Sequence, residues 1–184
     1  MSELELVRKS FIAFLDGLWW GLRDTVGALS MHEGYARGFR QIGIEAAERS
    51  SPRGPEAAAK TAAELMRALG LDARQEGHKI TVHSCPLTDR IIERGLEYAF
   101  RIDEICWLPM MQAIGERAGA VPSCKHSLSS LYLERQRLDY KIEKAKASFE
   151  AGKLSRDEFE REMSGLEKAK NGLPDHGEYV FERP

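Results

Sequence analysis

The sequence lacks two features that would place it in a common functional class. It has no excess of charge of one sign, since 27 Lys and Arg accompany 29 Asp and Glu for a formal net charge of −2. A basic excess is typical of proteins whose main task is to hold nucleic acid, so we expect no nucleic-acid partner. No apolar run reaches the roughly 18 residues that a transmembrane helix needs, so we expect no membrane span.

Cysteine is also scarce. The chain has three cysteines, an odd number at wide spacing, which is a poor disulfide framework for a secreted protein. The most apolar stretch, residues 11–22, is interrupted by Asp16 and two glycines and lacks the small-residue cleavage site of a signal peptide. We therefore expect a soluble, cytoplasmic protein.

Sequence motifs that would assign an enzyme class are missing as well. The chain contains no phosphate-binding loop, no dinucleotide-binding glycine motif, no His-Glu-x-x-His zinc motif and no nucleophilic serine elbow. Any catalytic function must therefore be argued from other residues.

Two long helical patterns occupy the first 50 residues. The first begins at a capping-box spacing, Ser2 and Glu5, and we treat residues 1–23 as an N-terminal helix. The second continues to about residue 48 and contains several glycines, each of which costs about 1 kcal/mol relative to alanine in a helix interior. Gly34 and Gly38 lie one turn apart on one helix face. Close helix packing is the explanation that we favour for them, and contact with a ligand is the alternative.

The middle of the chain alternates between helix and strand patterns. The expected elements are helices over 55–69, 89–100 and 103–117, and strands over 71–75, 78–84, 120–128 and 178–182. Thr88 is the expected cap of the second helix, and Pro109 should delay or kink the third. These elements predict an α+β fold, with a small antiparallel sheet packed against several helices.

Residues 129–172 have a different pattern. Leu131, Leu138, Ile142, Ala145 and Phe149 follow the spacing of a coiled-coil seam. A turn around Gly152 and a second capping box then start a returning helix. Because a strand is expected at each end of this segment, we predict a long antiparallel helical hairpin inserted in the last β-hairpin. Residues 24–128 and 176–184 would form the ligand-binding domain.

The order of short motifs resembles that of the 4-vinyl-reductase-like domains, also called hydrocarbon-binding domains. The motifs are the run from Asp24 to Gly27 with Gly34 and Gly38, Leu69-Gly70-Leu71, the hairpin at Gly77, Cys85-Pro86, Cys106-Trp107, Cys124, and the closing run from Gly177 to Glu182. The resemblance covers about 24–128 and 176–182. It implies a domain, often dimeric, with a pocket for an apolar small molecule between helices and sheet. The region from Cys85 to Cys106 is also similar to a group named for aminothiazoline-carboxylate hydrolysis.

The resemblance also implies candidate ligands for zinc. Cys106 and Cys124 fall on two ligand positions of the zinc-binding members, but Val121 stands where a glutamate is expected, and no cysteine lies near Gly177. His126 and His176 are the available substitutes. Thiolates and imidazoles suit zinc, and Cys124 and His126 alternate on the expected strand, so that both should point the same way. Plain burial of the cysteines is the alternative that we favour.

Candidate ligand-binding residues lie on the glycine-bearing helix and around Cys106. They are Gly34, Tyr35, Gly38, Cys85, Trp107, Met110 and Met111, with Tyr98 and Phe100 as further aromatic candidates. Ligand pockets are mostly apolar, but core packing explains most such residues equally well. Trp19 and Trp20 are adjacent and cannot both face one core from one helix. One of them should meet a partner, a ligand or solvent.

Cys85 has a second interpretation as a nucleophile, because His83 lies two residues away on the same strand face. A reactive cysteine needs a lowered pKa and a base within hydrogen-bond distance. A structural role at the strand end is favoured.

The resemblance and the sequence patterns together suggest three functions. The first is a homodimeric module, sensory or accessory, that binds an apolar small molecule such as a hydrocarbon or a tetrapyrrole. The second is an enzyme that uses a cysteine or a Cys/His-bound zinc, either to reduce a vinyl group or to hydrolyse a heterocycle. The third is a scaffold that binds a partner through the helical hairpin.

Overall fold

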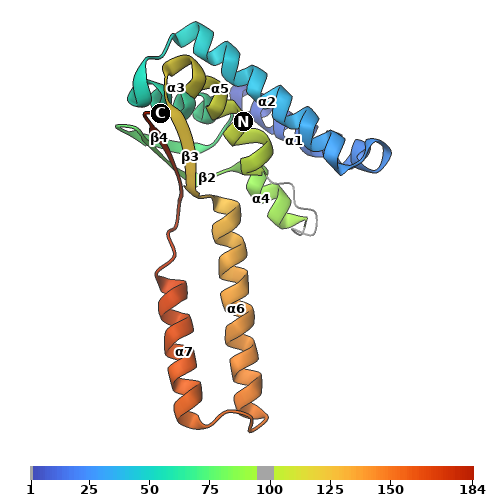
Figure 1. The fold of residues 1–184 in the computed structure, drawn as a ribbon. Helices are drawn as coiled ribbons and strands as arrows, with labels where there is room; N and C mark the ends of the chain where they lie inside the picture. The colour runs from blue at the N-terminus through green and yellow to red at the C-terminus, as the bar shows by residue number, and fades with distance from the viewer. Residues whose placement is uncertain (1, 95–101) are drawn as a thin grey trace. The chain divides into compact units, whose positions relative to one another are not determined.

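The computed structural model describes residues 2–94 and 102–184, and it confirms the α+β fold (Figure 1). The helices are α1 (Glu3–Val26), α2 (Ala28–Ser50), α3 (Gly54–Ala68), α4 (Pro86–Glu93), the π-helical turn η2 (Asp103–Trp107), α5 (Leu108–Ala118), α6 (Leu128–Glu150) and α7 (Arg156–Asn171). The strands are β1 (Asp72–Glu76), β2 (Lys79–Ser84), β3 (Val121–His126) and β4 (Gly177–Glu182).

The chain divides into two compact units. The main unit contains Met1–Leu128 and His176–Pro184, and the hairpin unit contains Ser129–Asp175. The N-terminal helix belongs to the main unit, where it extends to Val26 and packs against α2.

The four strands form one antiparallel sheet in the order β1-β2-β4-β3. The last strand of the chain, β4, therefore lies between β2 and β3. The predicted pairing of the strands on either side of the helical hairpin is confirmed, with Cys124 of β3 opposite Tyr179 of β4. The hairpin is inserted in the chain between two strands that are neighbours in the sheet.

The core of the main unit lies where α2, α3 and α5 meet one another and the sheet. Its largest fully buried side chains include Trp107, Met110 and Phe181. Gly43 allows α2 and α5 to approach closely, because a Cβ at this position would lie 2.2 Å from the carbonyl oxygen of Met110. The packing explanation for helical glycines therefore holds for Gly43.

The start of α4 differs from the prediction. α4 begins at Pro86 with Cys85 as its N-cap, because proline suits the first turn of a helix, and Thr88 lies inside the helix. Residues 95–101, with Tyr98 and Phe100, lie outside the described part of the chain. Pro109 acts as expected, since it follows the π-helical turn η2 at the start of α5.

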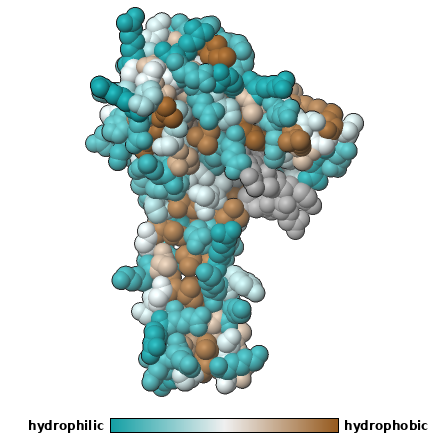
Figure 2. Space-filling view, viewed as in Figure 1, coloured by the Kyte–Doolittle hydropathy of each residue, from teal (hydrophilic) through white to brown (hydrophobic). Residues whose placement is uncertain are grey.

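The hairpin unit follows its predicted seam. Leu131, Leu138 and Ala145 are buried, and the rings of Phe149 and Phe159 stack at 4.5 Å between centroids. Figure 2 shows apolar side chains along the hairpin unit. The capping box at Ser155 and Glu158 is present. Among the described helices of the whole chain, none has the length and apolar character required to cross a membrane.

Candidate functional site

An apolar groove of about 350 Å³ lies between α1 and α2 in the main unit. From α1 it is lined by Phe11, Leu15, Leu18 and Leu22, and from α2 by Ser30, Met31, Gly34, Tyr35, Gly38, Phe39 and Ile42. Apolar patches interrupt the hydrophilic surface in the region of these two helices (Figure 2). We call this feature the α1–α2 groove.

Gly34 and Gly38 form a bare strip along the α1–α2 groove. Apart from the adjacent residues and the nearby backbone of α2 itself, no described atom lies within 4 Å of the Cβ that either residue would carry as alanine. The packing explanation that we favoured is therefore wrong for these two glycines within the described chain, in contrast to Gly43. They leave open space at the groove instead.

Tyr35 joins the two walls of the groove. Its hydroxyl donates a hydrogen bond to the carbonyl oxygen of Leu15, and its ring makes an edge contact with Trp19 at 5.9 Å between centroids. Burial raises the pKa of Tyr35 well above its ordinary value, and a nearby Cys106 thiol and Asp16 add to the shift. The phenol is therefore neutral at physiological pH, and its main role is to hold α1 against α2.

The predicted ligand-binding residues divide into two sets. Gly34, Tyr35 and Gly38 line the α1–α2 groove. The other four, Cys85, Trp107, Met110 and Met111, are buried in the core. Phe39 links the sets, because it lines the groove and packs edge-on against Trp107 at 5.3 Å between ring centroids.

The three cysteines lie near Asp103, and Cys85 and Cys106 are buried while Cys124 is partly buried. Burial raises the pKa of Cys85 and Cys106, and the Asp103 carboxylate adds to both shifts. The same two causes raise the pKa of Cys124 to about 12. Tyr179 donates a hydrogen bond to Asp103 from the adjacent strand. Thiols in such surroundings stay protonated, which is the reverse of what nucleophilic catalysis needs.

A β-bulge separates Cys124 from His126. Cys124 pairs with Tyr179, and His126 pairs with Glu178, because the register shifts between them. Successive residues of β4 point to opposite faces of the sheet, and directly opposite residues share a face. The alternation expected for Cys124 and His126 is thus interrupted, and their side chains lie on opposite faces.

The proposed zinc ligands are therefore not brought together as one set. Cys106 and Cys124 lie toward Asp103, whereas His126 and His176 lie near each other, with 6.0 Å between ring centroids. His176 also lies 5.4 Å from His83, again between ring centroids. The proximity of His83 and His126 to His176 could not be predicted from the sequence, because the three residues are far apart along the chain.

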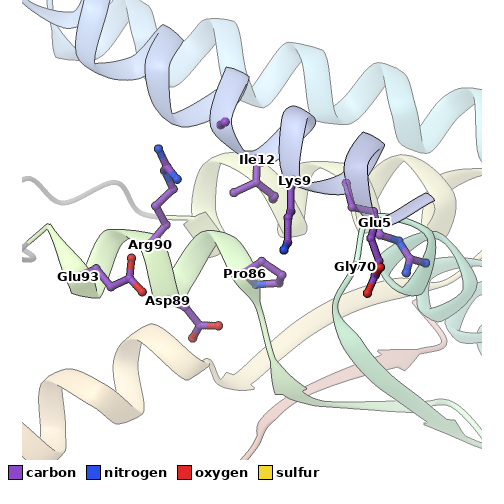
Figure 3. A pocket seen from close by; sticks show the side chains of 10 residues that line it. Glu5, Lys9, Ile12, Gly70, Pro86, Asp89, Arg90 and Glu93 are labelled. Atoms are coloured by element: carbon purple, nitrogen blue, oxygen red, sulfur yellow. The ribbon is translucent and has the colours of Figure 1, made fainter. Parts of the chain in front are cut away.

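A second groove, of about 610 Å³, lies between α1 and α4 and is charged (Figure 3). Glu5, Arg8 and Lys9 of α1 line it together with Asp89, Arg90 and Glu93 of α4. Arg8 is already engaged, since it donates to the carbonyl oxygens of Arg67 and Ala68 at 2.7 and 3.0 Å. With three basic and three acidic side chains, this groove has no preference for an anion or a cation.

Asp16 was missed by the sequence analysis as a structural residue. It is 3% exposed, and its carboxylate lies 2.5 Å from Arg90 and 3.0 Å from Arg94. The indole of Trp20 donates to the same carboxylate at 3.0 Å. This cluster answers the question of the adjacent tryptophans, because Trp19 enters the core while Trp20 lies beside Asp16 and the arginines.

Comparison with protein-family models, curated proteins and solved structures finds no match for this chain. The resemblance to hydrocarbon-binding domains stays a prediction.

Proposed function

We propose that the main unit binds an apolar small molecule in the α1–α2 groove. The observation that carries the proposal is the bare strip at Gly34 and Gly38, which faces open space beside apolar walls. Each glycine costs about 1 kcal/mol of helix stability, and no packing within the described chain offsets that cost. A ligand lying along the strip would fill the space.

The groove favours a narrow hydrocarbon over a tetrapyrrole. Its volume of about 350 Å³ lies near the lower end of the range of about 300–1,000 Å³ that is typical of ligand pockets. The lining has few polar groups, and the Tyr35 hydroxyl is already bonded to the Leu15 carbonyl. A chain without hydrogen-bonding groups along its length therefore fits better than a ring with polar substituents.

A homodimer would cover the open side of the groove. Leu4, Val7, Phe11, Phe14 and Leu18 follow 3-4 spacing along one face of α1, and we call them the α1 stripe. Phe11 and Leu18 line the groove, while Val7 and Phe14 are 64% and 62% exposed. Large exposed apolar patches mark interaction sites, and ligand pockets bury most of a ligand's surface. Pairing of two copies through the α1 stripe would supply that cover.

The enzyme alternative has less support. Cys85 and Cys106 are 1% and 0% exposed, so neither thiol is open to a substrate in this state. The candidate base, His83, lies beside His176. A reactive cysteine needs an accessible and electropositive setting, which is not the setting of these two residues.

The test compares leucine substitutions inside and outside the groove. A fluorescent long-chain fatty-acid analogue should bind the full-length protein saturably, and Gly38→Leu should abolish that binding by filling the groove. Gly17→Leu is the matched control, because Gly17 is an exposed glycine of α1 that does not line the groove and has open space at its Cβ position. Equal binding by the two variants would refute the proposal.

A further inference from the structure

We propose that His83, His126 and His176 form a binding site for a divalent transition metal of the zinc class. The site is independent of the α1–α2 groove, and it differs from the cysteine-based set that the sequence suggested.

The sheet topology brings the three histidines together. They come from the neighbouring strands β2, β4 and β3: His83 lies near the end of β2, His176 directly precedes β4, and His126 ends β3. Val82 pairs with Gly177, so the next position along each strand places His83 beside His176. The bulge in β3 turns His126 away from the face of Cys124 and Tyr179, toward the face of Glu178.

The distances suit metal coordination. The rings of His83 and His176 lie 5.4 Å apart, and those of His126 and His176 lie 6.0 Å apart, between centroids. A ring nitrogen of His83 also lies within 4.8 Å of one of His176. With zinc–nitrogen bonds of about 2.0–2.1 Å, two tetrahedral imidazole ligands place their nitrogens about 3.4 Å and their ring centroids about 5 Å apart. The His83–His176 pair is therefore close to the spacing of two ligands of one ion, and the His126 side chain would have to move toward them to complete the site.

His126 provides a second, independent indication. Its Nε2 atom is buried and has no hydrogen-bond partner among the described residues. Leaving a buried polar atom unsatisfied costs about 1–3 kcal/mol, and a metal ion would satisfy it. The His126 ring lies beside that of His176, which in turn lies beside that of His83.

Gly177 fixes the position of this end of the sheet. A Cβ at Gly177 would lie 3.3–3.5 Å from backbone atoms of residues 126–128. The shortest of these distances is slightly tighter than ordinary van der Waals contact, so a side chain at Gly177 would require the segment that follows β3 to shift by a small amount. The close approach of β3 and β4 at Gly177 thus keeps His126 near His176.

The ligand chemistry selects the metal class. Imidazole nitrogens suit Zn²⁺, Co²⁺, Ni²⁺ and Cu²⁺, and not the hard cations Ca²⁺ and Mg²⁺, which take oxygen ligands. Three imidazoles leave the fourth position of a tetrahedral site for water or another small ligand. The proposed site therefore differs from a structural zinc site, in which the protein supplies all four ligands, because one coordination position stays free.

The experiment uses Co²⁺ as a spectroscopic probe of the untagged, full-length protein after removal of metal with a chelator. We expect saturable binding of one Co²⁺ per chain, a visible absorption spectrum typical of nitrogen and oxygen ligands, and displacement by Zn²⁺. A thiolate-to-cobalt charge-transfer band in the near ultraviolet would instead assign the metal to the cysteines and overturn the proposal. Absence of saturable binding would also overturn it.

Variants and NMR identify the ligands. His83→Gln, His126→Gln and His176→Gln should each weaken binding by more than the roughly 10–100-fold that is typical of changes outside the coordination shell. His78→Gln is the matched control, because His78 is exposed in the turn between β1 and β2. In the wild-type protein, Zn²⁺ should shift the imidazole ¹⁵N resonances of the three histidines and leave that of His78 unchanged. This readout does not depend on the folding of any variant, and equal shifts at His78 would contradict the assignment.

Discussion

Asp16 of α1 and Arg90 of α4 are joined by a 2.5 Å ion pair in which the carboxylate is buried and the guanidinium is partly exposed. Arg94 and Trp20 bind the same carboxylate, so residues from two helices that are far apart in the sequence converge on one buried charge. A buried charge is costly unless it is paired, and the arrangement ties α1 to α4.

We predict that Asp16→Asn lowers the free energy of unfolding by about 2 kcal/mol. This value is below that of a fully buried pair because both arginines are partly exposed to solvent. Chemical denaturation is the measurement, and Asp24→Asn is the control. Asp24 pairs with Arg23 at 3.2 Å but its side chain is 83% exposed, so its loss should cost less than about 0.5 kcal/mol. If both variants lost a similar amount of stability, the stabilising role assigned to the buried Asp16 carboxylate would be contradicted.

Alanine at the helical glycines should have opposite effects at different positions. Gly34→Ala and Gly38→Ala should each raise the free energy of unfolding by up to about 1 kcal/mol, since the added methyl meets open space. Gly43→Ala should lower it by about 1–3 kcal/mol, because the methyl would overlap the Met110 carbonyl oxygen. Thermal and urea unfolding of the three variants measures these changes in the free energy of unfolding. Destabilisation by Gly34→Ala would show that a neighbouring segment occupies the groove.

The cysteines should resist alkylation in the folded protein. Because burial and Asp103 raise the pKa of Cys124 to about 12, only about one molecule in ten thousand carries the reactive thiolate at pH 8. Cys85 and Cys106 are also buried, with raised pKa values. Iodoacetamide labelling followed by mass spectrometry should find all three thiols intact in the folded protein at pH 8 and full labelling after denaturation. Rapid labelling of Cys85 or Cys106 at pH 8 would revive the enzyme alternative.

The helical hairpin should be dispensable for folding of the main unit. Replacement of residues 130–171 by a short glycine-containing turn should preserve the unfolding midpoint of the main unit, since β3 and β4 pair directly. If two copies pair through the α1 stripe, the shortened protein should also keep the oligomeric mass of the full chain in native mass spectrometry. Loss of the oligomer, with the main unit still folded, would assign assembly to the hairpin and favour the scaffold function.

Periodicity along the sequence predicted most of the fold. The two capping boxes, the coiled-coil seam and the hairpin at Gly77 are local signals, and each element they indicate is present. The pairing of β3 with β4 could also be inferred, because an inserted segment with its own seam leaves its two flanking strands as neighbours. These features depend on residues close together in the chain or on one topological argument.

The features that the sequence did not predict depend on contacts between distant residues. The bulge at Cys124 and His126 is a shift of one residue in strand register, and it reverses which face His126 occupies. The environment of a glycine is equally invisible, since Gly38 and Gly43 differ only in what another helix places beside them. Of the predicted ligand-binding residues, those that lie close together on one helix, Gly34, Tyr35 and Gly38, lie together at the α1–α2 groove.

The central claim is that an apolar ligand occupies the α1–α2 groove, and methyl NMR of ¹³C-labelled methionine tests it most directly. Met31 lines the groove, whereas Met110 and Met111 are buried in the core and Met163 belongs to the hairpin unit. On titration with a saturated long-chain alcohol, the account predicts a saturable shift of the Met31 methyl resonance and intermolecular nuclear Overhauser effects between this methyl group and the alcohol. The Met110 and Met163 resonances should not change. An unmoved Met31 resonance, or shifts confined to Met110 and Met111, would contradict it.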